Sequence, residues 1–307
     1  MTIVAGFKSH EGVVVCADTQ ETIGQLSKHN VPKLRFEPSD SHYRIASVMG
    51  QTSDNDLAVA FCGATDNGPY LDMVIDKAWD AARDATSLAE ACSVIEDSIK
   101  NTHQEYGGIY QTGYLPGTEI IYGVKMDGDS KLFYAYGPAI TEKDGYVTAG
   151  AGVHLANFLA SRIDVKYLGL RQCIILAAYV LFQTKEHVEG CGGDSQIAVL
   201  RNEGTSGPIH WGNIEAITKL LRNSDRELGE ILMQYADNTL SKEEFLKKAH
   251  DAFDILAATR EHELEKLQQT KEMFDAMFGM PLHDELGLPT PRTPFAPSSE
   301  RTEEPEQ

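Results

Sequence analysis

Two short apolar runs open the chain, and a polar segment with a glycine at its end separates them. Residues 2–8 and 13–17 are rich in β-branched side chains, and the segment between them reads Ser-His-Glu-Gly. This pattern predicts a β-hairpin. A two-residue loop sets Thr2 opposite Thr19, and a slip of one residue sets it opposite Asp18. Either register brings Thr2 within about 5–8 Å of Asp18.

The chain then alternates between strand-like and helix-like patterns. Strands are predicted at 43–49, 57–62, 119–125, 131–136, 146–149 and 196–200, and helices at 66–82, 87–107, 154–163 and 170–188. Thr65 or Asp66 is the expected cap of the first helix, and Gly107-Gly108 is the expected end of the second. The order favours helices on the outer faces of two packed antiparallel sheets, an α+β fold.

The pattern changes after Trp211. Residues 213–223 and 227–235 are predicted as two short amphipathic helices, and the capping-box sequence Ser241-Lys-Glu-Glu244 opens a long helix that stops at Gly279 and Pro281. An apolar stripe along this helix is expected to pack on the chain's own helices or on a neighbouring subunit. The predicted organisation is a domain at 1–211, a helical extension at 212–280 and a disordered tail at 281–307, which holds six of the twelve prolines.

Composition excludes some partners. The chain has 307 residues and a net charge of −19, which argues against nucleic acid or an anionic membrane as a partner because both attract basic surfaces. Five cysteines without metal-ligand spacing read as buried free thiols. With no signal peptide and no apolar run of transmembrane length, the expected location is the cytoplasm.

The hairpin also brings together groups that suit nucleophilic catalysis. Removal of Met1 would make Thr2 the first residue, and its free α-amine could then accept the proton of its own hydroxyl. Lys33, held by Asp18, would place positive charge beside that hydroxyl and favour its deprotonated form. The alternative interpretation of the hairpin alone is an ordinary N-terminal strand with surface charges.

Six motifs in order make the sequence similar to proteasome β-type subunits. They are Thr2-Ile-Val, Val13-Val-Val-Cys-Ala-Asp18-Thr-Gln-Glu-Thr22, Pro32-Lys33-Leu34, Phe61-Cys-Gly63-Ala-Thr-Asp66, Ala149-Gly-Ala-Gly152 and Gly190-Cys-Gly-Gly193-Asp194. The resemblance covers about residues 2–205. It implies an N-terminal nucleophile hydrolase with a four-layer αββα sandwich, and a threonine peptidase that needs no metal or organic cofactor. It also implies homo-oligomeric rings, peptide or unfolded protein as substrate, and an ATP-dependent unfoldase as a partner.

The same resemblance assigns the site. The catalytic residues that it implies are Thr2, Asp18, Lys33, Gly63, Glu189 and Cys191, and the substrate-binding residues are Glu21, Thr22, Val31, Phe61 and Thr65. Gly63 would lie between a strand and a helix, where its N–H could stabilise an oxyanion, although a turn glycine is an equal alternative.

Three positions depart from the family pattern. Ala151 and Cys191 stand where active members usually carry serine, and Glu189, or Val188 with a one-residue gap, stands at an aspartate position. Ala151 cannot form a hydrogen bond through its side chain, so either Glu189 or Asp194 replaces it or the site is slow. The sequence therefore favours a threonine-type endopeptidase subunit, and the alternative is a non-catalytic scaffold or binding subunit of the same fold.

Overall fold

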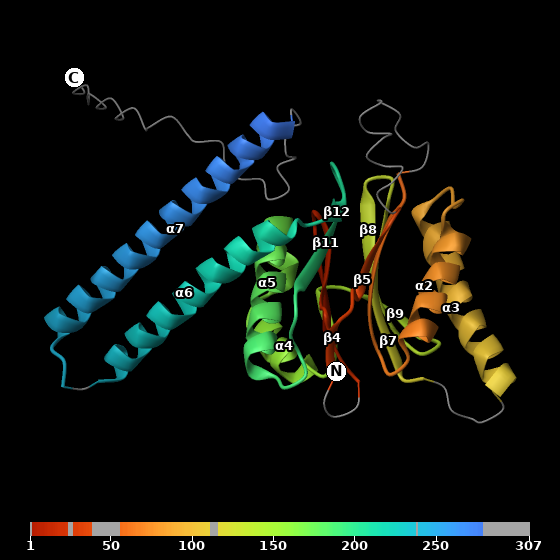
Figure 1. Cartoon of the computed structure of the whole chain (residues 1–307), viewed down its shortest axis with the longest axis horizontal. Coiled ribbons are helices and arrows are strands. Elements are labelled where there is room, and N and C mark those ends of the chain that lie inside the picture. Colours follow the sequence, from red (N-terminus) through yellow and green to blue (C-terminus); the bar gives the residue numbers. More distant parts are fainter. Residues whose placement is uncertain (1, 24–26, 39–55, 111–115, 238, 279–307) are drawn as a thin grey trace, which may run out of the picture.

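The protein is built as four layers, with two sheets face to face and helices on both outer sides (Figure 1). The computed structural model describes residues 2–23, 27–38, 56–110, 116–237 and 239–278. Its architecture is an α+β sandwich of antiparallel sheets with a C-terminal helical extension. The fold class expected from the sequence is confirmed.

The first sheet contains both strands of the predicted hairpin. Its strand order is β10 (Tyr146–Gly150), β1 (Ile3–Ser9), β2 (Gly12–Asp18), β11 (Ser195–Arg201) and β12 (Gly207–Pro208), all antiparallel. Ser9 pairs with Gly12 and Val4 pairs with Ala17, which is the register of a two-residue loop. Continued by two residues, this register sets Thr2 opposite Thr19, as the expected two-residue loop requires.

The second sheet lies against the first and carries the lysine segment at one edge. Its order is β5 (Leu34–Glu37), β6 (Ala58–Thr65), β7 (Thr118–Met126), β8 (Asp129–Tyr136) and β9 (Ala139–Lys143). A separate two-stranded ribbon, β3 (Gln20–Ile23) and β4 (Ser27–Asn30), follows β2 directly. The sequence pattern missed β3, β4, β5, β9 and β12, and the strand expected at 43–49 lies outside the described residues.

Helices cover the outer face of each sheet (Figure 1). Helices α2 (Gly68–Ala82) and α3 (Leu88–Tyr110) pack on the second sheet, and α4 (Val153–Ala160), the 3-10 turn η1 (Val165–Tyr167) and α5 (Leu170–His187) pack on the first. Two expectations are wrong in detail. Asn67 caps α2 by accepting from Tyr70 N at 3.1 Å, and α3 continues past Gly107-Gly108 because a glycine can remain in a helix whose other residues are packed.

Small residues let the two sheets approach closely. The core between them contains several alanines and valines, and two glycines face bulky neighbours across the gap. A Cβ added to Gly6 would lie 2.7 Å from Ile121 Cγ2, and one added to Gly123 would lie 2.6 Å from Leu200 Cδ1. Real Cβ atoms essentially never show contacts that short, so the facing side chains would have to shift. All five cysteines are buried and free, as expected.

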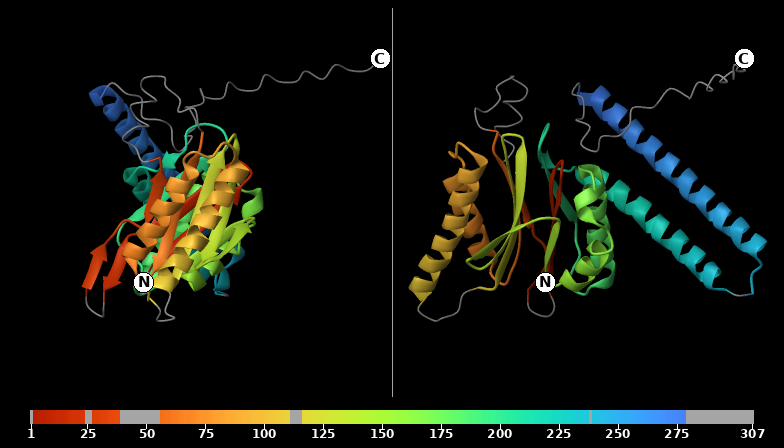
Figure 2. Two further views of the ribbon diagram at one scale, coloured as in Figure 1. Left: turned by 90° about the vertical axis from the view of Figure 1, so that its right-hand side faces the viewer. Right: turned by 180° about the vertical axis from the view of Figure 1, so that it is seen from behind.

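The C-terminal extension is a helical hairpin that leaves the body of the protein (Figure 2). Helix α6 (Trp211–Ala236) is continuous, which corrects the expectation of two short helices, and α7 (Lys242–Phe278) runs back along it. The capping box of α7 is confirmed, since Ser241 and Glu244 exchange hydrogen bonds. Part of the apolar stripe packs within the chain, because Phe245 meets Tyr235 with ring centroids 5.8 Å apart. The tail at 281–307 lies outside the described residues.

Several large apolar side chains of this hairpin remain exposed. They are Leu228, Leu232, Met233 and Tyr235 on α6, and Leu246, Phe253 and Ile255 on α7. Over the described ranges, none of the helices is long and apolar enough to span a membrane.

A buried histidine joins the two helices on the second sheet. His103 on α3 is 2% exposed, its Nδ1 is hydrogen-bonded to the hydroxyl of Tyr70 on α2, and its Nε2 is buried without a hydrogen-bond partner among the described residues. Burial lowers the pKa of His103 and raises the pKa of Tyr70 to about 12, so both groups are neutral at neutral pH. Protonation of His103 would leave a charge buried.

This contact predicts loss of stability in acid. Because the pKa of His103 is lowered in the folded chain, the unfolded chain binds the proton more readily below the ordinary value of 6.5, and stability falls as the pH drops through that value. One proton limits the slope to about 1.4 kcal/mol per pH unit. In His103→Gln, the free energy of unfolding measured with denaturant should depend less on pH between 7 and 5. The exposed His10, as His10→Gln, is the control, and an equal change in both variants would contradict the prediction.

Candidate active site

One buried carboxylate collects the groups at the start of the chain. Asp18, at the end of β2, is fully buried, and its Oδ1 accepts the hydroxyl of Thr2 and the N–H of Ile3, the latter at 3.2 Å. Its Oδ2 accepts the N–H of Gly192 at 2.9 Å. Continued by one residue, the hairpin register sets Ile3 opposite Asp18, which is why both contacts come from the start of the chain. The backbone therefore fixes the Thr2 hydroxyl.

Lys33 completes this cluster from the segment that leads into β5 of the second sheet. Its ammonium lies 2.8 Å from Asp18 Oδ1 and also donates to Thr2 Oγ1 and to the carbonyl of Gln20. An ammonium has three N–H donors, and these three acceptors use all of them. The Lys33 side chain is 11% exposed, so its charge acts on the Thr2 hydroxyl with little screening by water. The structure thus brings Thr2, Asp18 and Lys33 into direct contact.

The turn after β10 holds the backbone of Thr2. Gly152 N donates to the Thr2 carbonyl at 3.2 Å, and Gly150 has a φ of +88°. A Cβ on Gly150 would lie 2.4 Å from that carbonyl oxygen, so only glycine fits. Glu119 on β7 accepts from Gly150 N at 3.0 Å and from the Tyr134 hydroxyl at 2.6 Å. A carboxylate from the second sheet therefore supports the turn.

Cys191 lies beside the same turn. Its sulfur would lie 3.2 Å from a Cβ built on Gly152, and its side chain is 6% exposed. Burial raises the pKa of the Cys191 thiol to about 11, and the negative charge of Asp18 acts in the same direction. The thiol is therefore protonated at neutral pH. It can serve as a weak hydrogen-bond donor where a serine hydroxyl was expected.

Gly63 lies inside a strand, which corrects the expected position between a strand and a helix. It belongs to β6 and pairs with Ile120. A Cβ on Gly63 would lie 2.6 Å from Leu71 Cδ2 of α2, so the Leu71 side chain would have to shift to admit a larger residue. Because Leu34 pairs with Cys62, the register continued by one residue sets Lys33 opposite Gly63. Gly63 is thus a backbone neighbour of the cluster.

Ala151 and Glu189 offer no side-chain hydrogen bond to the cluster. Ala151 is exposed in the turn before α4, and Glu189 is exposed in the turn after α5. Among the residues whose placement is described, Glu189 has no hydrogen bond to Thr2, Asp18 or Lys33, and its expected role at the site stays a prediction. Asp194 is also exposed, and its backbone N–H donates to Thr19 Oγ1 at 2.7 Å. The exposed turn positions explain why these carboxylates point to solvent.

The expected substrate-binding residues divide into two groups. Glu21 and Thr22 lie on β3, directly after Gln20, and Val31 lies two residues before Lys33 and is 38% exposed. These three are close in the chain to groups that contact the Lys33 ammonium. They remain candidates for contacts with an extended substrate.

The other two substrate-binding candidates lie elsewhere. Phe61 is fully buried and stacks on Tyr122 at 5.7 Å in the core beneath α2 and α3, so its prediction as a pocket wall is wrong. The alternation of β6 turns Phe61 toward the helices and Cys62 toward the other sheet. Thr65 Oγ1 accepts from Asn67 N at 3.0 Å and lies 3.2 Å from Thr118 Oγ1. Its hydroxyl therefore holds the residue that caps α2.

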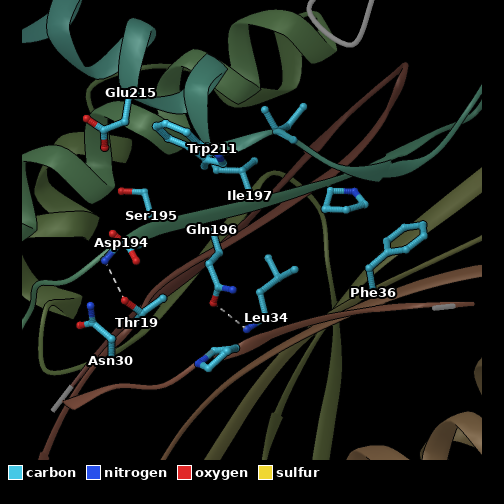
Figure 3. A pocket seen from close by; sticks show the side chains of 13 residues that line it. Thr19, Asn30, Leu34, Phe36, Asp194, Ser195, Gln196, Ile197, Trp211 and Glu215 are labelled. Carbon is cyan, nitrogen blue, oxygen red and sulfur yellow. Dashed lines mark hydrogen bonds between the residues drawn. The ribbon is translucent and has the colours of Figure 1, made fainter. Parts of the chain in front are cut away.

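A cavity of about 950 Å³ lies beside the Lys33 segment, between β5 and β11 (Figure 3). Gln196 projects into it from β11 and accepts two backbone hydrogen bonds, from Lys33 N at 2.9 Å and from Leu34 N at 3.2 Å. Apolar walls come from Ile197, Phe36 and Trp211. Nothing in the sequence marked Gln196, because its role depends on pairing between distant strands. Within the described ranges, no group of three or more His, Cys, Asp or Glu side chains could hold a metal ion.

Solved structures with a similar fold include several Anbu proteins. No protein-family model matches the sequence, and no curated protein matches it. Anbu (ancestral beta-subunit) from Yersinia bercovieri aligns with a TM-score of 0.57 at 12% identity, over 78% of this chain and 100% of that one. The Anbu complex of Pseudomonas aeruginosa, solved as a helical assembly, aligns with a TM-score of 0.56 at 14% identity and covers 76% of this chain and 96% of that one. Anbu from Hyphomicrobium sp. strain MC1 aligns with a TM-score of 0.56 at 13% identity and covers 75% of this chain and 97% of that one.

These likenesses identify the fold as that of proteasome-like N-terminal nucleophile hydrolases. The chemistry has to be argued from this chain's own residues.

The buried ion pair predicts strong coupling between Asp18 and Lys33. Asp18→Ala leaves the Lys33 ammonium buried without its carboxylate and should lower the free energy of unfolding by about 3–5 kcal/mol. Lys33→Met should cost a similar amount, and the double variant should lose much less than the sum. Chemical denaturation of the four proteins measures the coupling. The exposed pair Lys131–Glu142, at 3.0 Å, is the control and should show little coupling. Additive effects at Asp18 and Lys33 would contradict the ion pair.

Proposed function

We propose that this chain is a threonine-type endopeptidase subunit of a self-compartmentalised, proteasome-like protease. The observation that carries the proposal is the Thr2 hydroxyl, which is held between the Asp18 carboxylate and the Lys33 ammonium. A threonine hydroxyl is a weak nucleophile unless a base and a charge activate it. Both needs are met here once the residue before Thr2 is removed and its α-amine is free.

The proposed reaction uses the first residue as nucleophile and base. Thr2 Oγ1 attacks the carbonyl carbon of a peptide bond, and the Thr2 amine takes the hydroxyl proton. The amine then gives this proton to the departing peptide nitrogen, which leaves an ester between Thr2 and the acyl fragment. Water, deprotonated by the same amine, hydrolyses the ester and restores the hydroxyl. No metal or organic cofactor enters these steps.

The neighbouring groups stabilise charge during the reaction. The Lys33 ammonium lowers the energy of the developing Thr2 alkoxide, and Asp18 keeps the ammonium in place. The Gly63 N–H is the proposed donor to the oxyanion, supported by its position opposite Lys33. Cys191 is proposed to help orient the Thr2 amine through its protonated thiol.

The substrate and assembly follow from the same proposal. An extended or unfolded polypeptide would pair with the backbone near Thr22, with Glu21 and Val31 beside it. The chain would form homo-oligomeric rings that enclose the sites, in the cytoplasm, with an ATP-dependent unfoldase supplying substrate. Assembly is supported by the helical assembly of the Anbu complex, a protein of the same fold.

A second function is favoured by one specific observation. Ala151 has no side-chain group that could hydrogen-bond to a freed Thr2 amine, and Glu189 is exposed. A chain without those contacts could serve as a non-catalytic scaffold or binding subunit of the same assembly. Processing and labelling of Thr2 distinguish the two functions.

The peptidase function predicts covalent labelling of processed Thr2. Intact mass spectrometry should show loss of Met1 and, after exposure to an epoxyketone or a β-lactone, addition of one probe molecule. Thr2→Ala should take up no probe and should hydrolyse no peptide, while its melting temperature stays near that of the wild type. Thr2→Ser should keep part of the activity, because it retains the hydroxyl and the amine. Retention of Met1, or hydrolysis by Thr2→Ala above about a few per cent of wild type, would refute the enzyme function.

The exposed helical hairpin predicts a role in assembly. Apolar side chains such as Leu232, Met233 and Phe253 face solvent on an isolated chain, which favours burial against a second copy. Deletion of residues 241–307 should therefore lower the oligomer mass measured by light scattering. Deletion of 283–307 alone should leave it unchanged, because that segment has few large apolar residues. A folded product of the longer deletion with an unchanged oligomer mass would exclude α7 from the contact.

A further inference from the structure

The backbone of the Lys33 segment is held by a single side chain from the opposite sheet. Gln196 Oε1 accepts from Lys33 N at 2.9 Å and from Leu34 N at 3.2 Å. Gln196 pairs with Ala17 in the first sheet, and the next pair toward the site is Ser195 with Asp18. The same stretch of β11 therefore flanks the strand that carries Asp18 and holds the segment that carries Lys33.

This segment has few backbone donors of its own. It joins β4, which ends at Asn30, to β5, which begins at Leu34. Val31 N donates to Thr19 O at 2.7 Å, and Pro32 has no N–H to donate. The next N–H groups along the chain are the two that Gln196 accepts. Gln196 thus fixes the segment at the point where the Lys33 side chain leaves the backbone.

The position of that point matters because lysine has a long and flexible side chain. Its ammonium must meet Thr2 Oγ1, Asp18 Oδ1 and the Gln20 carbonyl at once. A four-carbon stem can reach three fixed acceptors from only a narrow range of backbone positions. A displacement of about 1 Å in a catalytic group can cost a factor of about 100 in rate.

We propose that Gln196 is a positioning residue, which fixes the Lys33 backbone so that the ammonium contacts Thr2 and Asp18 together. Its effect on rate rests on the proposed peptidase function, and its effect on the backbone does not. Gln196 is half-buried and borders the cavity beside β5, so its replacement removes hydrogen bonds without leaving a hole in the closed core (Figure 3). The substitution is therefore a clean test.

The test compares Gln196→Met, which has similar length and no amide, with Gln196→Glu, which keeps an oxygen acceptor. Amide hydrogen exchange of the assembled protein should become about tenfold faster at Lys33 and Leu34 in Gln196→Met and stay protected in Gln196→Glu. In peptide hydrolysis, Gln196→Met should lower kcat about 10- to 100-fold with KM within about twofold of wild type. Gln196→Glu should restore most of kcat.

Glu215→Gln is the matched control, because Glu215 borders the same cavity and is exposed. It should leave both exchange and kcat unchanged. Where Gln196→Met does not fold, Gln196→Asn takes its place, since it keeps the amide but is one methylene shorter.

The outcomes separate the two proposals. Unchanged amide hydrogen exchange at Lys33 and Leu34 in Gln196→Met would overturn the positioning role. A Gln196→Glu variant as slow as Gln196→Met, with both amides protected, would overturn it as well. Absence of turnover and of probe labelling in the wild type would refute the peptidase function, while the exchange data would still decide whether Gln196 holds the segment.

Discussion

A carboxylate without access to water is the constraint on which this structure depends. Asp18 is fully buried, and a buried charge is tolerated only when it is paired and hydrogen-bonded. Its partners come from three places in the chain: the first residues, the turn before β11, and the segment that leads into β5. Folding must bring all three to one point, so the cluster is as much a requirement of stability as of chemistry.

The site therefore rests on strands and tight turns rather than on a long loop. Thr2 is held through its hydroxyl by Asp18 and through its carbonyl by Gly152, and Glu119 supports the same turn from the other sheet. This arrangement leaves the Thr2 hydroxyl little freedom. The buried thiol of Cys191 adds a soft, protonated group beside the same turn, at a position where the sequence resemblance predicts a serine hydroxyl.

Local patterns predicted what depends on local physics. The hairpin is predictable from the sequence because β-branched residues flank a short polar segment, and either of its two expected registers brings Thr2 near Asp18. The capping box of α7 was predicted for the same reason. The side of the sheet that Phe61 faces was not predicted. A fully buried strand has apolar residues on both sides, so the sequence does not show which of them pack against the helices. Gln196 was missed since its partners lie more than 160 residues away in sequence.

The two glycines between the sheets carry a further consequence. Gly6 and Gly123 face side chains of the opposite sheet, and a Cβ at either position would force those side chains to shift. Asp18 ends a strand of the first sheet, and Lys33 directly precedes β5 of the second. The ion pair of 2.8 Å between them therefore spans the same gap in which the two glycines leave room. A substitution between the sheets, far from Asp18 and Lys33, can thus act on the geometry of the pair without touching it.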